Sequence, residues 1–279
     1  MRIVSILSTA VMLVAAPFAS HAEQRCEHSA PRDSTMDLSG IKVVVFDIGP
    51  HMLSVTGGKA GTGSIRGKAC ASDAKRLGEL VVTQHRDGDT LIVRAAENGS
   101  KLNVSWSGET YRYLTLSAAL PDSLAVRIKV GSGDAVVDGV ASLSADVGSG
   151  DLVARHIRDT MYADVGSGDI QASDIGALHV VSIGSGDMSV RDVRGDAWVG
   201  EINSGDLAIA HAKGKVGIGS IGSGDAVLSA IAGNVNVERI GSGDLEANGV
   251  GGDLVVDHVG SGSVDHRDVH GKVRIPEDD

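Results

Sequence analysis

Aspartate returns at one fixed position along the second half of the chain, directly after a glycine, at intervals of 17 to 19 residues. If the repeats stack on one another, these carboxylates form a column with neighbours about 5 Å apart. Such a column either binds cations or bonds to backbone amides and holds a turn. Calcium-binding solenoids place the aspartate two positions after the last glycine and use two such turns per coil, so we expect structural turns here. The column consists of Asp134, Asp151, Asp169, Asp187, Asp206, Asp225 and Asp244.

A second candidate column carries rings, in a chain whose aromatic content is only 3%. Tyr162, His179 and Trp198 fall on the same outward position of three successive repeats, and Gly217 follows them where it leaves space beside the indole. A flat strip of rings on a sheet face suits stacking on sugar rings. Isolated surface aromatics are the alternative interpretation. We take the three ring-bearing residues as candidate ligand-binding residues.

Histidine and aspartate share another repeat position, which carries His156, Asp174, Asp192 and His211. Between adjacent repeats this predicts that His156 pairs with Asp174 and that Asp192 pairs with His211. Surface ion pairs of small energy explain these residues better than an acid–base pair does.

The C-terminal segment gathers side chains that could ligate a metal. His266 and His270 would share a face only on a helix, whereas this segment is expected to be strand and turn, with His266 pointing inward. The chain has no Gly-x-Ser-x-Gly elbow, no His-Glu-x-x-His and no paired-cysteine motif. We therefore predict no catalytic residue, no cofactor and no bound metal, and a protein that is not an enzyme. The C-terminal candidates are Asp257, His258, Asp265, His266 and His270.

The repeat itself determines the expected fold. The tetrapeptide Gly-Ser-Gly-Asp, or a near copy, occurs eight times from residue 131 onward. In the 19-residue frame, apolar residues stand two apart, as in strands, and the longer steps bracket glycines or polar pairs, as in corners. One unit cannot bury its apolar face alone, so the units must stack. We predict an all-β, single-chain parallel β-helix with 18 to 19 residues per coil and a core of Val, Ile, Leu and Ala.

The Gly-Ser-Gly-Asp segment is expected to be a corner. Its glycines would allow positive φ and close approach between coils. Asn203, which replaces the first glycine of one copy, is a residue that tolerates the left-handed region. This replacement predicts that the first position of the corner requires a particular backbone conformation.

Three segments are expected along the chain. Residues 1–22 have the positive start, apolar stretch and small residues of a secretory signal. Residues 23–120 predict an irregular, β-rich N-terminal cap with the first coils, including a strand at Lys101–Trp106 and a short helix within Ala71–Leu77. An even pair of cysteines in an exported chain, Cys26 and Cys70, predicts a disulfide that pins this cap. Residues 121–279 are predicted to form the regular parallel β-helix. Pro276 and residues 277–279 would protect its last edge strand.

A resemblance follows from these motifs. The run Leu120-Pro-Asp-Ser-Leu-Ala-Val-Arg-Ile-Lys-Val-Gly-Ser-Gly-Asp134, followed by repeated Gly-Ser-Gly-Asp coils behind a signal peptide, resembles the bacterial "putative adhesin" β-helix family, also called head-GIN-like. The resemblance spans about residues 38–275. It implies a right-handed parallel β-helix in an exported protein and implies no established enzyme activity or functional residue.

Three functional interpretations remain. The leading one is a non-enzymatic exported scaffold, an adhesin or envelope interaction protein whose partner is an envelope protein or a glycan. The alternatives are a polysaccharide-binding or polysaccharide-active β-helix and a self-assembling rod. The net charge of −11 disfavours nucleic acid and anionic membranes as partners, and no segment after the signal is long and apolar enough to span a membrane. We expect a monomer in the periplasm, with surface display or secretion as alternatives.

Overall fold

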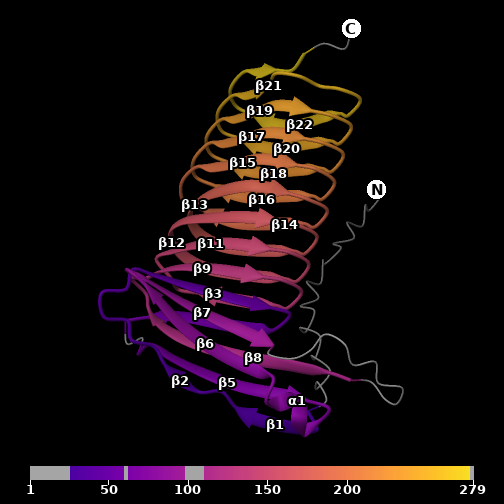
Figure 1. Ribbon diagram of the computed structural model, residues 1–279. Helices are drawn as coiled ribbons and strands as arrows, with labels where there is room; N and C mark the ends of the chain where they lie inside the picture. The colour runs from indigo at the N-terminus through magenta and orange to yellow at the C-terminus, as the bar shows by residue number, and fades with distance from the viewer. Residues whose placement is uncertain (1–25, 60–61, 98–109, 277–279) are drawn as a thin grey trace, which may run out of the picture.

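The computed structural model describes residues 26–59, 62–97 and 110–276. It is an all-β solenoid of about eight turns. Figure 1 shows the turns stacked along one axis, with antiparallel strands and a short helix gathered at the N-terminal end of the stack. The signal segment 1–22, the strand expected at Lys101–Trp106 and residues 277–279 lie outside the described residues. No helix in the described part of the chain has the length and apolar character that a membrane span requires.

Each turn contributes one strand to each of two parallel sheets. Sheet 1 holds the strands that follow the glycine corners, and sheet 2 holds the strands that lead into them. Strands β12 (Leu152–Val165) and β13 (Ile170–Ile183) run through both sheets without a break. The other regular strands of sheet 1 are β10 (Ala135–Asp138), β14 (Met188–Val193), β16 (Leu207–Ala212), β18 (Ala226–Ile231), β20 (Leu245–Val250) and β22 (Val264–Val269).

The strands of sheet 2 follow the same order. They are β9 (Ala125–Val130), β11 (Ser142–Val147), β15 (Ala197–Ile202), β17 (Val216–Ile221), β19 (Val235–Ile240), β21 (Leu254–Val256) and β23 (Val273–Arg274). Every strand pairs in parallel with the equivalent strand one turn away, so equivalent residues form straight columns. The parallel β-helix predicted from the repeat is confirmed.

The columns explain which residues are buried. In β14, Met188 and Val190 point inward with Arg191 outward, and Asp192 has a positive φ of 60°. That left-handed residue places two outward side chains in succession, so Val193 returns to the core. The same position is left-handed in most turns, at His156, Asp174, Asp192, His211, Ala230, Gly249 and Asp268.

The glycine corners work by close approach and not by positive φ. A Cβ built on Gly186, the second glycine of its corner, would lie 1.9 Å from the carbonyl oxygen of Gly168 one turn below. Neither glycine has a positive φ in any of the Gly-Ser-Gly-Asp corners, and Asn203 does not have one either. The expectation of left-handed corner residues was therefore wrong. Asn203 fits because its Nδ2 donates to the carbonyl oxygen of Ile183, 3.3 Å away.

The N-terminal turns do not stack in sequence order. Strands β3 (Val43–Gly49) and β4 (Met52–Gly58) form a turn that pairs with β9 and β10 on one side. On its other side it pairs with β7 (Thr90–Glu97) and β8 (Arg112–Pro121), which come later in the chain. The first turn in the sequence is thus the second turn in space, inserted between two later ones.

Antiparallel strands close the N-terminal end of the stack. Strand β6 (Leu80–Asp87) pairs with β7, and β5 (Ser64–Ala71) pairs with β8 and with β1 (His28–Pro31) and β2 (Ser34–Thr35). Between β5 and β6 lies α1 (Ala74–Leu77), whose N-cap is Asp73. Cys26 and Cys70 form a disulfide across 44 residues, as the cysteine pair predicted. This disulfide ties the segment before β1 to β5.

The core is aliphatic, with one aromatic exception near the cap. Val, Ile, Leu and Ala fill most inward columns, and Phe46 in β3 is fully buried. His51 is also fully buried, in the corner between β3 and β4. At the opposite end, His266 occupies the column of Ala247 one turn earlier but is exposed, because no described turn covers it.

Candidate functional site

The aspartate column is a ladder of hydrogen bonds between corners. Oδ1 of each aspartate accepts the backbone N–H of the aspartate in the next turn, at 2.9 to 3.3 Å from Asp134 up to Asp244. Asp244, at the end of the column, accepts from both the backbone N–H and the hydroxyl of Ser263, at 2.7 and 2.8 Å. The arrangement is an amide-bonded column, which gives each carboxylate a partner without a cation.

A shorter ladder of the same kind runs up the opposite corner. Asp196 accepts the backbone N–H of Lys215 at 3.0 Å, Asn234 accepts that of Asp253 at 3.0 Å, and Asp253 accepts that of Lys272 at 2.8 Å. Neutral Asn234 fills the same role as the aspartates, so the acceptor oxygen matters here and the charge does not. Among the described residues, no group of three or more histidine, cysteine, aspartate or glutamate side chains is placed to hold a metal ion.

The column of left-handed residues carries ion pairs at the surface. His211 Nδ1 lies 3.6 Å from Asp192 Oδ1, which is the pair expected from the repeat. His156 does not pair with Asp174; its Nδ1 lies 2.7 Å from Oδ1 of Asp138, in the preceding turn. Asp174 bonds instead to the guanidinium of Arg194. The pairing differs because the arginine reaches the carboxylate from the following corner.

The C-terminal histidines and aspartates do not converge. His266 stands in the inward column of sheet 1, whereas His258 directly precedes Val259, which pairs with Ile240 of sheet 2, and His270 lies in the corner after β22. All three side chains are exposed. These histidines are polar side chains of the exposed last turn, which was the alternative to a metal site.

The ring-bearing residues form a continuous outward column on sheet 2. Tyr162 stands opposite His179 in the register, and His179 stands opposite Trp198. The ring centroids of Tyr162 and His179 are 5.4 Å apart. Tyr162 is 49% exposed and Trp198 is 39% exposed, in a protein with few exposed large apolar side chains. We call Tyr162, His179 and Trp198 the aromatic strip.

Glycine shapes the surface beside the strip. Gly217 stands opposite Trp198 in the next turn, and a Cβ there would lie 2.5 Å from the indole Cε3. The indole therefore lies over Gly217, which is itself buried. Gly200 and Gly219 likewise lack side chains at outward positions of β15 and β17.

Two shallow depressions follow the strip along sheet 2. One, of about 660 Å³, runs along Trp198 and is bordered by Glu201, Glu238 and Arg239. The other, of about 430 Å³, lies between Tyr162 and Arg127. Exposed Val181, in β13, borders both. The two depressions thus form one track that crosses strands β9 to β19, about 30 Å at the usual strand spacing.

The repeat marks the rings but not the polar border of this track. Glu201, Glu238 and Arg239 stand in outward positions that vary from turn to turn, so no repeat signal marks them. The sequence feature that could have indicated the track is glycine at outward positions where neighbouring turns carry side chains. Gly200, Gly217 and Gly219 show that signal.

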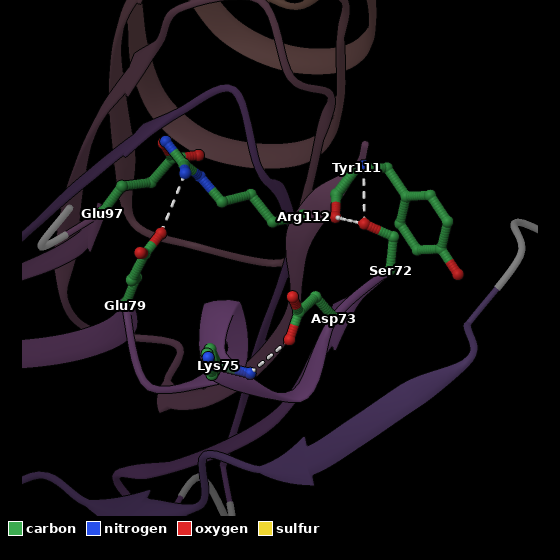
Figure 2. A network of polar contacts seen from close by, with 7 residues as sticks. All are labelled: Ser72, Asp73, Lys75, Glu79, Glu97, Tyr111 and Arg112. Atoms are coloured by element: carbon green, nitrogen blue, oxygen red, sulfur yellow. Dashed lines mark hydrogen bonds and ion pairs between the residues drawn. The ribbon is translucent and has the colours of Figure 1, made fainter. Parts of the chain in front are cut away.

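A polar network holds the cap together and lies apart from the strip. Arg112 bonds to Glu97 and, at 2.9 Å, to Glu79, and these bonds raise the pKa of the arginine above its ordinary value. The backbone N–H of Tyr111 donates to the hydroxyl of Ser72, and Figure 2 shows this contact beside the Arg112 pairs. These contacts join β7 and β8 to the segment between β5 and β6, so their role is structural.

His51 is the buried titratable group nearest to this network. Its Nδ1 accepts the backbone N–H of Leu114 at 3.3 Å, so the proton of the neutral ring is on Nε2, which has no hydrogen-bond partner among the described residues. Burial lowers the pKa of His51, an effect that Glu97 opposes and Arg112 reinforces. A neutral, buried ring in this place supports the packing of the first turns.

The two-stranded turns, the glycine corners and the antiparallel cap define a β-solenoid. The chain belongs to the Toastrack DUF4097 family, whose sequence model matches residues 69–226, more than half of its length. The resemblance to bacterial β-helix proteins that the motifs indicated is thereby confirmed.

Two solved structures of low sequence identity were matched to the chain. A "putative adhesin" from Parabacteroides merdae is 11% identical, with a TM-score of 0.47, over 86% of this chain and 97% of that one. A "putative lipid binding protein" from Parabacteroides distasonis is 14% identical, with a TM-score of 0.35, over 90% of this chain and 98% of that one. No curated protein sequence matches the chain. Likeness at this level carries no inference about ligands.

Proposed function

We propose that this protein is a non-enzymatic, exported scaffold of the cell envelope that acts as an adhesin or interaction protein and binds a glycan through the aromatic strip. The observation that carries the proposal is the indole of Trp198 lying over Gly217, beside a track bordered by carboxylates and an arginine. A flat ring face presented to solvent stacks on the apolar face of a sugar ring, and the polar border supplies hydrogen bonds to hydroxyl groups.

The shape of the track favours binding over catalysis. From residue 124 to residue 276, the segments between strands are short corners, and no long insertion rises beside sheet 2 to exclude water from a bound chain. A glycosidase needs a pair of carboxyl groups on either side of the scissile bond within an enclosed site. A shallow track of this length fits an extended polymer lying on the surface.

Binding to a glycan array tests this proposal. The Trp198→Ala variant removes the stacking surface and should lose most of the signal, at least tenfold. The matched control is Val227→Ala, which removes an exposed apolar side chain from sheet 1. Wild-type protein that binds no glycan, or equal binding by Trp198→Ala and wild type, would refute the proposal. Circular dichroism of both variants verifies that the fold is intact.

Export and the domain boundaries form part of the same proposal. Cleavage after residue 22 would leave a mature chain with the cap in residues 23–120 and the regular helix in residues 121–279. The Cys26–Cys70 disulfide supports an oxidising destination, such as the periplasm. N-terminal sequencing of the exported protein and cell fractionation test these statements, and a cytoplasmic, uncleaved chain would contradict them.

We also propose that the protein is a monomer, in preference to an end-to-end rod. His266 supports this, because it stands in a column where the preceding turns place Ala, Val, Ile or Leu against the next turn. A stacked partner would bury an imidazole without a designated acceptor. Light scattering after size exclusion should report the mass of one chain, and a series of multimers would favour the rod.

A further inference from the structure

Two arginines on sheet 1 have no partner, although the chain carries 36 acidic and 25 basic residues. Arg155 in β12 and Arg191 in β14 are exposed, and neither side chain makes an ion pair or hydrogen bond within the described residues. By contrast Arg267, in the same outward column, pairs with Glu246 at 2.9 Å. An acidic protein that leaves two neighbouring guanidinium groups unpaired keeps their donors available.

The register brings these two arginines to one place. Arg155 stands opposite Ser173, and Ser173 stands opposite Arg191, so the arginines lie two turns apart, about 10 Å between backbones, with a serine between them. A depression of about 240 Å³ opens among them, and Gln171 and Ser189 also border it. Among the described residues, no carboxylate lines this depression. Asp138 stands opposite Arg155 in the register, but its carboxylate already contacts the imidazole of His156.

We infer that Arg155, Ser173 and Arg191 form a binding site for a tetrahedral oxyanion, a phosphate or sulfate group, independent of the aromatic strip. The guanidinium plane presents parallel N–H donors that match two oxygens of such a group, so two arginines approaching from opposite sides cover four acceptor positions. The hydroxyls of Ser173 and Ser189 and the side-chain amide of Gln171 add neutral donors. The site is on sheet 1, whereas the aromatic strip is on sheet 2.

The anion chemistry follows from the donors and the missing acceptors. A cation would meet two positive charges, and an apolar ligand would find little apolar surface in this depression. A single carboxylate offers two oxygens, which one arginine already satisfies. A tetrahedral group is the ligand that uses both arginines and the serine between them.

Titration of the full-length mature chain with inorganic phosphate, followed by amide NMR at constant ionic strength, tests this site. The amide signals of Ser173 and Ser189 should shift and saturate. Arg155→Gln and Arg191→Gln should each weaken binding about tenfold, as expected for a lost charged hydrogen bond. Arg267→Gln is the matched control, since it removes the same charge from the same column and should leave binding unchanged.

Vesicles distinguish the source of the anion. If phosphatidylglycerol vesicles retain the protein, phosphatidylcholine vesicles do not, and both arginine variants stay in solution, the site takes a lipid headgroup. If phosphate saturates the site and the vesicles do not bind, it takes a free anion or one on a non-lipid polymer. The inference is overturned if neither probe binds, or if Arg267→Gln weakens binding as much as the other two variants. Trp198→Ala should leave phosphate binding unchanged, so the failure of the glycan proposal would not affect this one.

Discussion

Oδ1 of Asp187 accepts the backbone N–H of Asp206 at 3.0 Å, across the boundary between two turns. The same bond recurs up the corner column, so each carboxylate is tied to the backbone of the turn above it. The negative charges repel one another along the column, and the amide dipoles offset that repulsion. A column that has the composition of a cation site is thus part of the scaffold.

Replacing Asp187 separates the acceptor from the charge. Asp187→Ala removes the acceptor of the Asp206 N–H and should lower the free energy of unfolding by about 1 kcal/mol, a value at the lower end because the group is exposed. Asp187→Asn should cost much less, since Asn234 already accepts an equivalent amide. Urea unfolding measures both. Ser185→Ala in the same corner serves as the control, and equal losses for the Asn and Ala variants would contradict the acceptor role.

Gly186 tests the close approach of the turns. A Cβ at this position would lie 1.9 Å from the backbone oxygen of Gly168, which cannot move without shifting a turn. Gly186→Ala should destabilise the protein by about 3 kcal/mol or more. Gly58→Ala is the control because open space surrounds that position. Thermal unfolding of the two variants should differ clearly, and similar melting temperatures would show that the corner is more adaptable than described.

A substitution at Gly217 tests whether the indole of Trp198 lies against this residue. The atoms that a new Cβ would strike belong to the side chain of Trp198, at 2.5 and 2.7 Å, so the ring and not the backbone must move. Gly217→Ala should therefore change the tryptophan fluorescence and weaken glycan binding with little loss of stability. Placing both proteins in a Trp106→Phe background isolates the signal of Trp198. An unchanged emission spectrum would mean that the indole is not seated over Gly217.

Removing the disulfide tests the cap. Cys26 and Cys70 close a loop of 44 residues, for which the chain-entropy relation gives about 4 kcal/mol of stabilisation. The double variant Cys26→Ser/Cys70→Ser should lose much of this stability. Hydrogen exchange should increase in β1 and β5 and remain unchanged in β16 to β20. Uniformly faster exchange along all turns would mean that the cap and the regular turns unfold as one unit.

Acid should weaken the protein through His51. Burial lowers the pKa of this ring below its ordinary value of 6.5, so the unfolded chain binds a proton first as the pH falls. The free energy of unfolding contributed by the neutral ring is complete above pH 6.5 and decreases below it, until the folded form also protonates. His51→Gln keeps an acceptor for the Leu114 amide and removes the titration. The loss of stability between pH 7 and pH 5 should be smaller in this variant than in wild type.

The repeat predicted the inward columns because alternation of side chains is a property of any strand. Met188, Val190 and Val193 are buried as the frame placed them. The irregularity between Val190 and Val193 was also predictable from the 19-residue repeat. One residue separates inward-facing positions in a regular strand, whereas two residues separate Val190 from Val193, which requires an inserted residue. The frame did not show that this residue is left-handed, since Ala230 is left-handed there without any side-chain preference for that conformation.

Other features could not be predicted from the repeat pattern. The positive φ expected at the corner glycines is absent because close contact between turns, and not backbone conformation, excludes a side chain there. The Arg112 pairs and the insertion of β3 and β4 between later strands depend on contacts between segments far apart in a non-repeating region. The position of Trp198 over Gly217 was predictable because both lie in one column of the repeat.

The insertion of the β3–β4 turn between β7–β8 and β9–β10 determines how the chain can assemble. Leu53 pairs with Leu116 and with Ala135, so this turn is complete only after more than 80 further residues are available. The turns from β14 onward need only a neighbour 19 residues away. We therefore expect residues 26–138 to form as one cooperative, slow unit that supplies the template, and later turns to add one at a time and to fray one at a time. In the export proposed above, this chain would remain without a template until about residue 138 had crossed the membrane.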